Sequence, residues 1–190
     1  MKITKARKED APVIAQSVMA AIGDEICLGL AGEKNTLDDV RRMFTTLAGR
    51  DDSQYSYLNT LAAVTDEGET VGVCVGYDGA LLHELRKAFI EEAKKELGLE
   101  FDEMEDETDP TEFYLDTLAV NPEYRGQGIA KKLLRASIDR AAEIGKPAGL
   151  LVDKTNANAR RLYESIGFRQ VGERPFCFVL MDHLQFPAGR

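Results

Sequence analysis

Residues 113–144 constrain the fold more than any other part of the sequence. Residues 113–120 form a short apolar run typical of a buried strand, and an Asn-Pro turn dipeptide at 121–122 ends it. A loop containing Gly126 and Gly128 follows, and apolar residues then recur at helical spacing. The order of strand, turn, glycine loop and helix predicts a helix that begins beside the end of a sheet strand.

The start of this helix has the form of a phosphate site. A helix N-terminus offers unpaired N–H groups and a partial positive charge, and the flanking glycines let an anion approach the backbone. The loop is no G-x-G-x-x-G fingerprint, because Lys131 stands at the third glycine, and no P-loop, because it lacks G-K-[ST]. Lys131, Lys132 and Arg135 lie in the first turns, where the helix dipole disfavours cations unless phosphate is bound. The alternative is that all three are solvated side chains on an exposed face.

The rest of the chain predicts a mixed α/β fold with a central sheet. No internal repeat or domain linker is evident, so we expect one domain over residues 1–190. The predicted strands are 3–6, 57–65, 70–77, 113–120, 149–152, 168–171 and 176–181, and the predicted helices are 11–22, 36–47, 81–97, 128–144 and 156–166.

The charge of the chain is concentrated in one segment. Of 33 acidic and 24 basic residues, residues 91–112 hold eleven acids and two lysines, a local charge of −9, so the remainder has 33 − 11 = 22 acids and 24 − 2 = 22 bases. A nucleic-acid-binding protein should instead show a basic stripe, so we expect no nucleic-acid partner. The acidic segment is either a solvated, mobile loop that adds solubility or a surface that attracts a cationic substrate.

Membrane, secretory and metal-binding proteins are also disfavoured. No apolar run approaches the roughly 20 residues that a membrane span needs, and the N-terminus lacks a signal-peptide stretch, so we expect a cytoplasmic protein. The three cysteines lie far from one another, and neither His83 nor His183 stands at metal-ligand spacing to them. Cys177 lies in the apolar run 176–181, which predicts a core strand with a buried, unreactive thiol.

Two motifs make the chain resemble the GCN5-related N-acetyltransferase (GNAT) family. Residues 125–130, Arg-Gly-Gln-Gly-Ile-Ala, match the R/Q-x-x-G-x-G/A motif, and the preceding strand end Leu118-Ala119-Val120 with its Asn-Pro turn is typical of the family. A second match, N-x-x-A-x-x-L-Y-x-x-x-G-F, runs from Asn156 to Phe168. The resemblance covers residues 113–181 well and residues 1–77 only in the order of elements.

The resemblance implies an acyl-CoA N-acyltransferase fold, with a mixed, mostly antiparallel sheet flanked by helices. Two central parallel strands would splay apart, and acetyl-CoA would lie in the gap. The departure from the family is residues 78–112, a helical and acidic insertion that would lie on the amine side of the cleft. No metal is implied. The resemblance assigns cofactor binding to Leu118, Ala119, Val120, Arg125, Gly126, Gln127, Gly128, Ile129, Ala130, Lys131 and Asn156.

Two residues are candidates for catalysis. The resemblance gives Tyr163 the role of general acid, which protonates the departing thiolate of coenzyme A; the alternative is a buried position on the apolar stripe of its helix, and the two are compatible. Asp116 is an acid within an otherwise apolar strand. It is a candidate general base, an ammonium anchor or a structural aspartate, and a bulge would change the direction of its side chain.

The predicted function is therefore acetyl transfer from acetyl-CoA to a primary amine of a small molecule or protein, by direct attack in a ternary complex. The alternatives are a non-catalytic acyl-CoA-binding sensor or interaction module, and an enzyme that acetylates protein N-termini. A cationic amine is the expected partner if the acidic segment steers substrate. Exposed edge strands pair in many family members, so a homodimer is one expected assembly.

Overall fold

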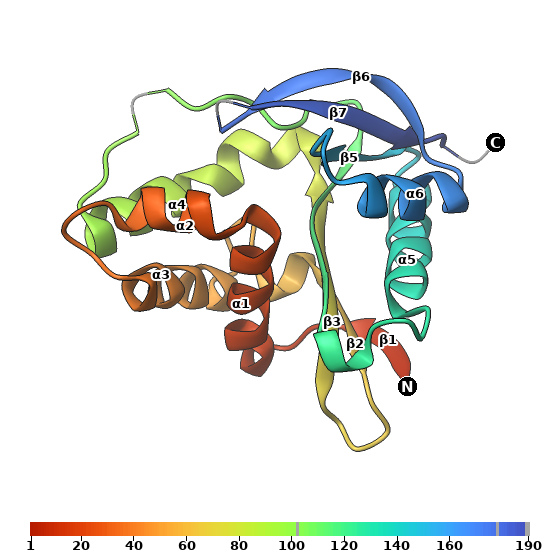
Figure 1. The fold of residues 1–190 in the computed structure, drawn as a ribbon, viewed down its shortest axis with the longest axis horizontal. Coiled ribbons are helices and arrows are strands. Elements are labelled where there is room, and N and C mark those ends of the chain that lie inside the picture. The colour runs from red at the N-terminus through yellow and green to blue at the C-terminus, as the bar shows by residue number, and fades with distance from the viewer. Residues whose placement is uncertain (102, 178, 189–190) are drawn as a thin grey trace.

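A seven-stranded sheet lies between two layers of helices in the computed structural model, which describes residues 1–101, 103–177 and 179–188 (Figure 1). The strand order is β1-β2-β3-β4-β5-β7-β6, and every neighbouring pair is antiparallel except β4 and β5. Helices α1–α4 cover one face, and α5 and α6 cover the other. The predicted mixed, mostly antiparallel sheet is confirmed.

The element bounds agree with most of the predicted ranges. The strands are β1 (Lys2–Lys5), β2 (Thr60–Val64), β3 (Thr70–Asp78), β4 (Phe113–Val120), β5 (Ala148–Val152), β6 (Arg169–Phe176) and β7 (Val179–Phe186). The helices are α1 (Ala11–Ile22), α2 (Asp24–Ala31), α3 (Leu37–Gly49), α4 (Leu82–Leu97), α5 (Ile129–Glu143) and α6 (Ala157–Ile166).

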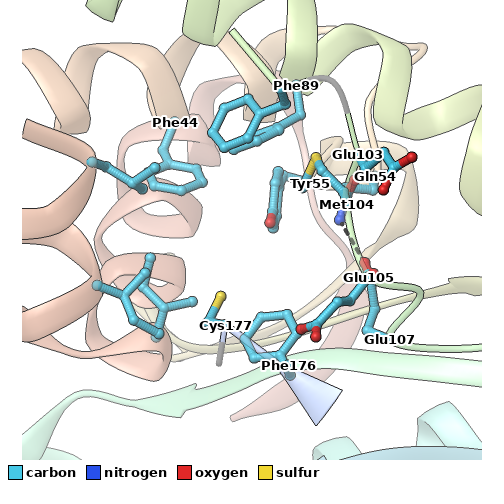
Figure 2. A pocket seen from close by; sticks show the side chains of 14 residues that line it. Phe44, Gln54, Tyr55, Phe89, Glu103, Met104, Glu105, Glu107, Phe176 and Cys177 are labelled. Carbon is cyan, nitrogen blue, oxygen red and sulfur yellow. Dashed lines mark hydrogen bonds between the residues drawn. The ribbon is translucent and has the colours of Figure 1, made fainter. Parts of the chain in front are cut away.

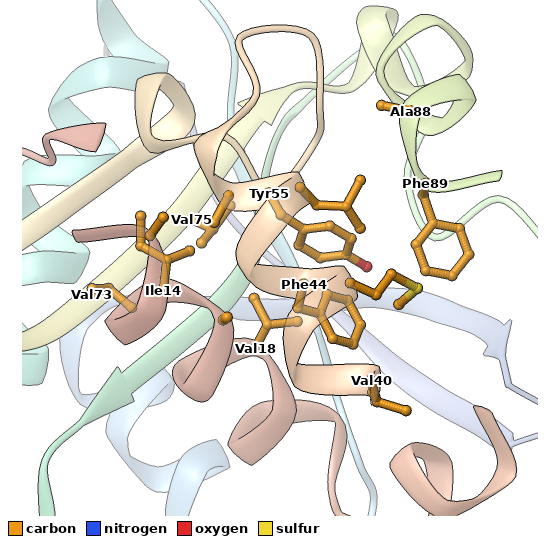
Figure 3. Packing of buried hydrophobic residues seen from close by; sticks show 14 of the residues in the cluster. Ile14, Val18, Val40, Phe44, Tyr55, Val73, Val75, Ala88 and Phe89 are labelled. Carbon is orange, nitrogen blue, oxygen red and sulfur yellow. The ribbon is translucent and has the colours of Figure 1, made fainter. Parts of the chain in front are cut away.

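The main core lies between the sheet and the α1–α4 layer. Ile14 and Val18 of α1 and Phe44 of α3 pack against Val73 and Val75 of β3 (Figure 3). These side chains are almost fully buried, and each contributes roughly 1.5–3 kcal/mol of hydrophobic stabilisation. A second core joins the opposite face of the sheet to α5 and α6. The two cores hold the sheet rigid around the point where β4 and β5 separate.

Strands β4 and β5 pair only at their beginnings. Phe113 pairs with Ala148 and Tyr114 with Gly149, and beyond these two pairs the strands have no common register. Strand β4 continues to Val120 without a partner on this side. The splayed strands that the family resemblance implied are therefore present, and they leave backbone groups of β4 free to bind a ligand.

A β-bulge at Asp116 changes the direction of the β4 side chains. Thr117 pairs with Val75 and Leu115 with Gly76, so Asp116 has no partner on β3. Before the bulge Leu115 packs into the core on the α5 side, and after it Leu118 does. The alternation has thus shifted by one residue, as expected when an extra residue is inserted into one strand.

Two local predictions were wrong. Helix α2 was not predicted. It has only eight residues, too few to show a clear helical period, and Gly29 interrupts its apolar pattern. The run 176–181 is two strand ends joined by a turn instead of one core strand, and Cys177 in that turn is exposed with φ 48°. Phe178, which that prediction included, lies outside the described residues. The predicted pairing of the last two strands is confirmed.

Candidate active site

The glycine loop before α5 is built to accept an anion. Gly126 and Gly128 have φ of 78° and 76°, a backbone region that favours glycine, and open space surrounds the position of a side chain at both. The first helical hydrogen bond runs from the Lys132 N–H to the Gly128 carbonyl. The N–H groups of residues 128–131 precede that bond, and within the described residues they donate to no protein acceptor. A phosphate group fits this arrangement.

The side chains around the loop favour an anion too. Lys131, Lys132 and Arg135 are exposed on α5, close to its positive end. The Arg125 side chain turns back to the strand, where its Nε donates to the Val120 carbonyl at 3.2 Å. Both interpretations of the three cations that the sequence left open, phosphate contact and solvated surface, are compatible with these positions.

A cavity of about 520 Å³ lies between α1, the start of β3 and the end of β4, next to the glycine loop. Ala119, Val120 and Arg125 line it on one side, and residues of α1 line it on the other. The Leu118 and Val120 side chains pack against the core on the α5 side, so their backbone groups are what the strand edge offers to a ligand. The structure therefore brings the predicted residues Ala119, Val120 and Arg125 to one cavity, and Leu118 precedes them on the same strand.

Asp116 occupies the bulge of β4. It is partly buried, and Thr117 Oγ1 donates to its Oδ1 at 3.0 Å. Burial and the neighbouring Glu107 carboxylate raise the pKa of Asp116 to about 7, while hydrogen bonds from Thr117 and Gln54 oppose the shift. A carboxylate with this pKa can accept a proton near neutral pH.

Tyr163 lies on the opposite face of the sheet from Glu107. Its ring packs edge-to-face on Phe168, with 5.9 Å between centroids, in the same core as Leu118 and Val120. Burial raises the pKa of the Tyr163 phenol above its usual value, which keeps the hydroxyl protonated. The predicted roles of core packing and proton donation can therefore coexist at this position.

Asn156 performs a structural task. It is the N-cap of α6, and its Oδ1 accepts a hydrogen bond of 3.1 Å from the Ala159 N–H. A contact from its amide group to a cofactor stays a prediction.

The acidic segment is folded into the protein, so the interpretation as a solvated, mobile loop was wrong for its second half. Arg86 of α4 is buried, forms an ion pair with Glu107 and donates to Asp106 and to the Glu105 carbonyl at 2.9 Å each. Glu112 is fully buried. No local pattern predicts this arrangement, because Arg86 and Glu107 are 21 positions apart in the chain.

A second cavity, of about 560 Å³, was not predicted (Figure 2). It lies between α2, α3, α4, the acidic segment and the turn that joins β6 to β7. Gln54 and Glu107 line it, and both act on Asp116 electrostatically. Gln54 and Glu107 thus connect this cavity to Asp116, whereas the first cavity meets β4 at its end, at Ala119 and Val120. The lining residues are Ile22, Ile26, Leu30, Phe44, Gln54, Tyr55, Phe89, Phe101, Glu103, Met104, Glu105, Glu107, Phe176 and Cys177.

The described residues form neither a metal cluster nor a single membrane-spanning helix. No group of three or more His, Cys, Asp or Glu side chains is arranged to hold a metal ion. No single described helix is long and apolar enough to cross a membrane; residues 8–22 and α2 meet those criteria only together, across a bend of 106°.

The splayed strands, the bulge and the glycine loop form the arrangement that the two motifs implied. The sequence model of the acetyltransferase (GNAT) family matches residues 33–168, well over half of the chain. The chain belongs to the GNAT acetyltransferase family. The matched range includes the bulge, the glycine loop and Tyr163, so this GNAT chain carries the candidate site within the part that defines the family.

Known proteins agree with this identification. A protein whose solved crystal structure is described as an acetyltransferase is 32% identical to this GNAT chain, with a TM-score of 0.80 over 100% of both chains. The N-alpha-acetyltransferase RimI of Mycobacterium tuberculosis is 42% identical over 67 residues, 35% of this chain and 41% of the relative. The spermine/spermidine N(1)-acetyltransferase of Bacillus subtilis is 32% identical over 78 residues, 40% of this chain and 51% of the relative. The matches thus span about half or less of these curated relatives.

Proposed function

We propose that this protein transfers an acetyl group from acetyl-CoA to a primary amine. The observation that carries the proposal is the separation of β4 from β5 after Tyr114, directly beside a helix N-terminus with free N–H groups. The gap offers unpaired backbone groups to a pantetheine arm, and the loop offers donors to a pyrophosphate. The names of the curated relatives, which are N-acetyltransferases, support the same reaction.

The residues that would hold acetyl-CoA follow from these positions. Backbone groups of residues 118–120 would bond the pantetheine arm as an added strand would, and N–H groups of residues 127–130 would bind the pyrophosphate. Acetyl-CoA supplies the acetyl group, and its thiol is the leaving group. A backbone N–H near Val120 would polarise the thioester carbonyl, and alignment in a closed complex would supply much of the rate.

Asp116 and Tyr163 move the two protons of the reaction in this proposal. Asp116 accepts the proton that the amine loses as its nitrogen forms the new C–N bond. Tyr163 donates its proton to the sulfur as the C–S bond breaks. Tyr163 belongs to the core on the α5 side of the sheet, whereas Asp116 is acted on by Gln54 and Glu107, which line the cavity beside α2–α4, so each can act on a different side of the reacting groups. Solvent returns the proton to Tyr163 and removes it from Asp116 after each turnover.

The experiment that tests the proposal is a thiol-release screen of amine classes with acetyl-CoA, run beside calorimetric titration of coenzyme A. We expect coenzyme A binding and amine-dependent thiol release. Binding without thiol release on any amine would contradict the enzyme and favour the acyl-CoA sensor. A sensor has no use for a proton acceptor at Asp116 or a donor at Tyr163, and their positions therefore favour the enzyme.

A further inference from the structure

The cavity beside Asp116 has an apolar body and a polar end. Phe44, Tyr55 and Phe89 line one side of the space in Figure 2, and Phe176 lies opposite them. The centroids of the Phe44 and Tyr55 rings are 5.2 Å apart in edge-to-face contact, and those of Phe89 and Phe101 are 5.5 Å apart. Neighbouring rings thus hold one another in place, so the aromatic surface is formed before any ligand enters.

The polar end of the cavity carries an acceptor without a donor. Gln54 is 4% exposed, and its Nε2 donates to Glu107 Oε1 at 3.2 Å. Only the amide nitrogen can donate to a carboxylate, so this contact fixes the orientation of the Gln54 amide. Its Oε1 is buried and has no hydrogen-bond partner among the described residues. A buried acceptor of this kind is satisfied by a ligand that brings an N–H group.

The charge at this end is negative as well. The Glu107 carboxylate accepts hydrogen bonds from Gln54 and, at 3.1 Å, from the Tyr77 hydroxyl, and it pairs with Arg86. The Arg86 guanidinium already forms ion pairs with Glu107 and Asp106, so its positive charge is balanced by these two carboxylates. Asp116 adds a second carboxyl group nearby. An ammonium head suits this surrounding, whereas a carboxylate or phosphate head would meet acceptors.

The part of the cavity lining that comes from α1 and α2 offers no second partner for a charge. It consists of Ile22, Ile26 and Leu30, all with apolar side chains. A second ammonium group of a polyamine would lose its hydration against these side chains without a partner. The remaining acids of the lining, Glu103 and Glu105, are exposed. They can attract a cation toward the cavity without holding one inside it.

We propose that the acceptor is a primary monoamine carried on one apolar body, aromatic or alkyl, which fills the cavity lined by Phe44, Tyr55, Phe89 and Phe176 with its amine directed to Gln54 and Asp116. The volume of about 560 Å³ falls in the range of small-molecule sites, roughly 300–1,000 Å³. This inference rests on the proposed function, because it names the acceptor of that same reaction. It assigns the acidic segment a role as one side of the acceptor site.

The test compares 2-phenylethylamine with spermidine and an alanine-initiated peptide in the thiol-release assay. We expect kcat/KM for 2-phenylethylamine to exceed that for either of the others at least tenfold. Preference for spermidine or the peptide would overturn the acceptor assignment while the proposed acetyl transfer stands. Calorimetry with the coenzyme A complex measures amine binding independently of turnover, so binding without thiol release would contradict the proposed function and support the cavity assignment.

Two tryptophan substitutions on α2 provide a matched pair. Ile26 lines the cavity, whereas Leu28 of the same helix is 57% exposed. We expect Ile26→Trp to fill the cavity and raise KM for 2-phenylethylamine at least tenfold, with unchanged affinity for coenzyme A. Leu28→Trp should leave KM within twofold of the wild type. An unchanged KM in a folded Ile26→Trp protein, as judged by its circular dichroism spectrum, would overturn the assignment.

Discussion

The carboxylate of Glu112 lies 2.8 Å from Nε2 of His183, although the two residues are 71 positions apart in the chain. Gln185 donates to the same carboxylate oxygen at 2.8 Å, and Thr108 donates to the other at 2.7 Å. The group joins the end of the acidic segment to β7. It lies at the closed end of the gap, where β4 and β5 still pair.

Removal of this carboxylate should destabilise the protein. Glu112→Ala would leave the partners of a fully buried group unsatisfied, and we expect the free energy of unfolding to fall by about 3 kcal/mol. Urea unfolding followed by circular dichroism measures the change. Glu100→Ala is the control, because its exposed carboxylate pairs with Lys94 at the surface and its removal should leave the free energy of unfolding nearly unchanged. Equal effects of the two substitutions would contradict the prediction.

A companion substitution approaches the same group from β5. A Cβ at Gly149 would overlap the Glu112 carboxylate, so Gly149→Ala should cost about 2 kcal/mol by displacing that side chain from its partners. Combined with Glu112→Ala, it should cost much less than alone, because the overlapping atoms are gone. Additive free energies in the double variant would show that the two residues are independent.

Much of the fold follows from local sequence patterns. The burial of the Glu107 and Glu112 carboxylates depends instead on partners that are distant in the chain. The glycine loop and the strand before it are continuous in sequence, so their spacing suffices to predict a phosphate site. Glu107 and Glu112 have the same local surroundings as solvated acids, and only Arg86 and His183, remote in the chain, show that they are buried.

The second cavity and the exact position of the bulge could not be predicted for a related reason. Gln54 has no sequence signal, because its role depends on Glu107 and on rings from two helices, two loops and the end of β6. The bulge at Asp116 depends on the register with β3, which no pattern within β4 specifies. The turn at Cys177 was not predicted, because the residues on both sides of it are apolar and such a run is typical of a continuous strand.

Asp116 should determine the acidic limb of the pH profile. Its pKa of about 7 means that the carboxyl group can accept a proton only above that pH, so kcat/KM should rise with pH through about 7. We expect Asp116→Asn to lower kcat/KM about 10²-fold and to remove the step near pH 7. Glu100→Gln should keep the step. An unchanged profile in Asp116→Asn would exclude Asp116 as the base.

The same substitution should affect stability with a defined sign. Because burial raises the pKa of Asp116, the folded protein holds this proton more tightly than the unfolded chain, and stability is lost as the pH rises from about 4 to about 7. Asparagine cannot ionise. Asp116→Asn should therefore raise the free energy of unfolding at pH 8, by about 2 kcal/mol given the partial exposure, and change it little at pH 4. A larger gain at pH 4 than at pH 8 would contradict this account.

Loss of the Tyr163 hydroxyl should slow turnover without weakening cofactor binding. Tyr163→Phe keeps the ring that packs on Phe168, so we expect the melting temperature to change by less than about 2 °C. The reduction in kcat should be about 10²-fold, the lower end of the range for a general acid. Steady-state kinetics on the amine with the highest kcat/KM measures it. Full turnover in the variant would exclude Tyr163 as the proton donor.

The glycine loop can be tested by two matched alanines. Gly128→Ala places a side chain at φ 76°, which costs about 1–2 kcal/mol in that conformation and favours a rearranged loop. We expect the Kd for coenzyme A to rise about tenfold, equivalent to about 1.4 kcal/mol. Gly145→Ala carries the same strain at φ 69° near the other end of α5 and should leave the Kd unchanged. Equal Kd values in the two variants would place the pyrophosphate elsewhere.

The most direct test follows a labelled acetyl group from acetyl-CoA in the presence of the wild-type protein and 2-phenylethylamine, spermidine or a peptide. If the protein is an N-acetyltransferase, we expect the labelled acetyl group on an amine nitrogen, as an amide, with one equivalent of free coenzyme A for each amide formed. Label that remains on coenzyme A bound to the protein, with every amine unmodified, would contradict the account and identify an acyl-CoA sensor.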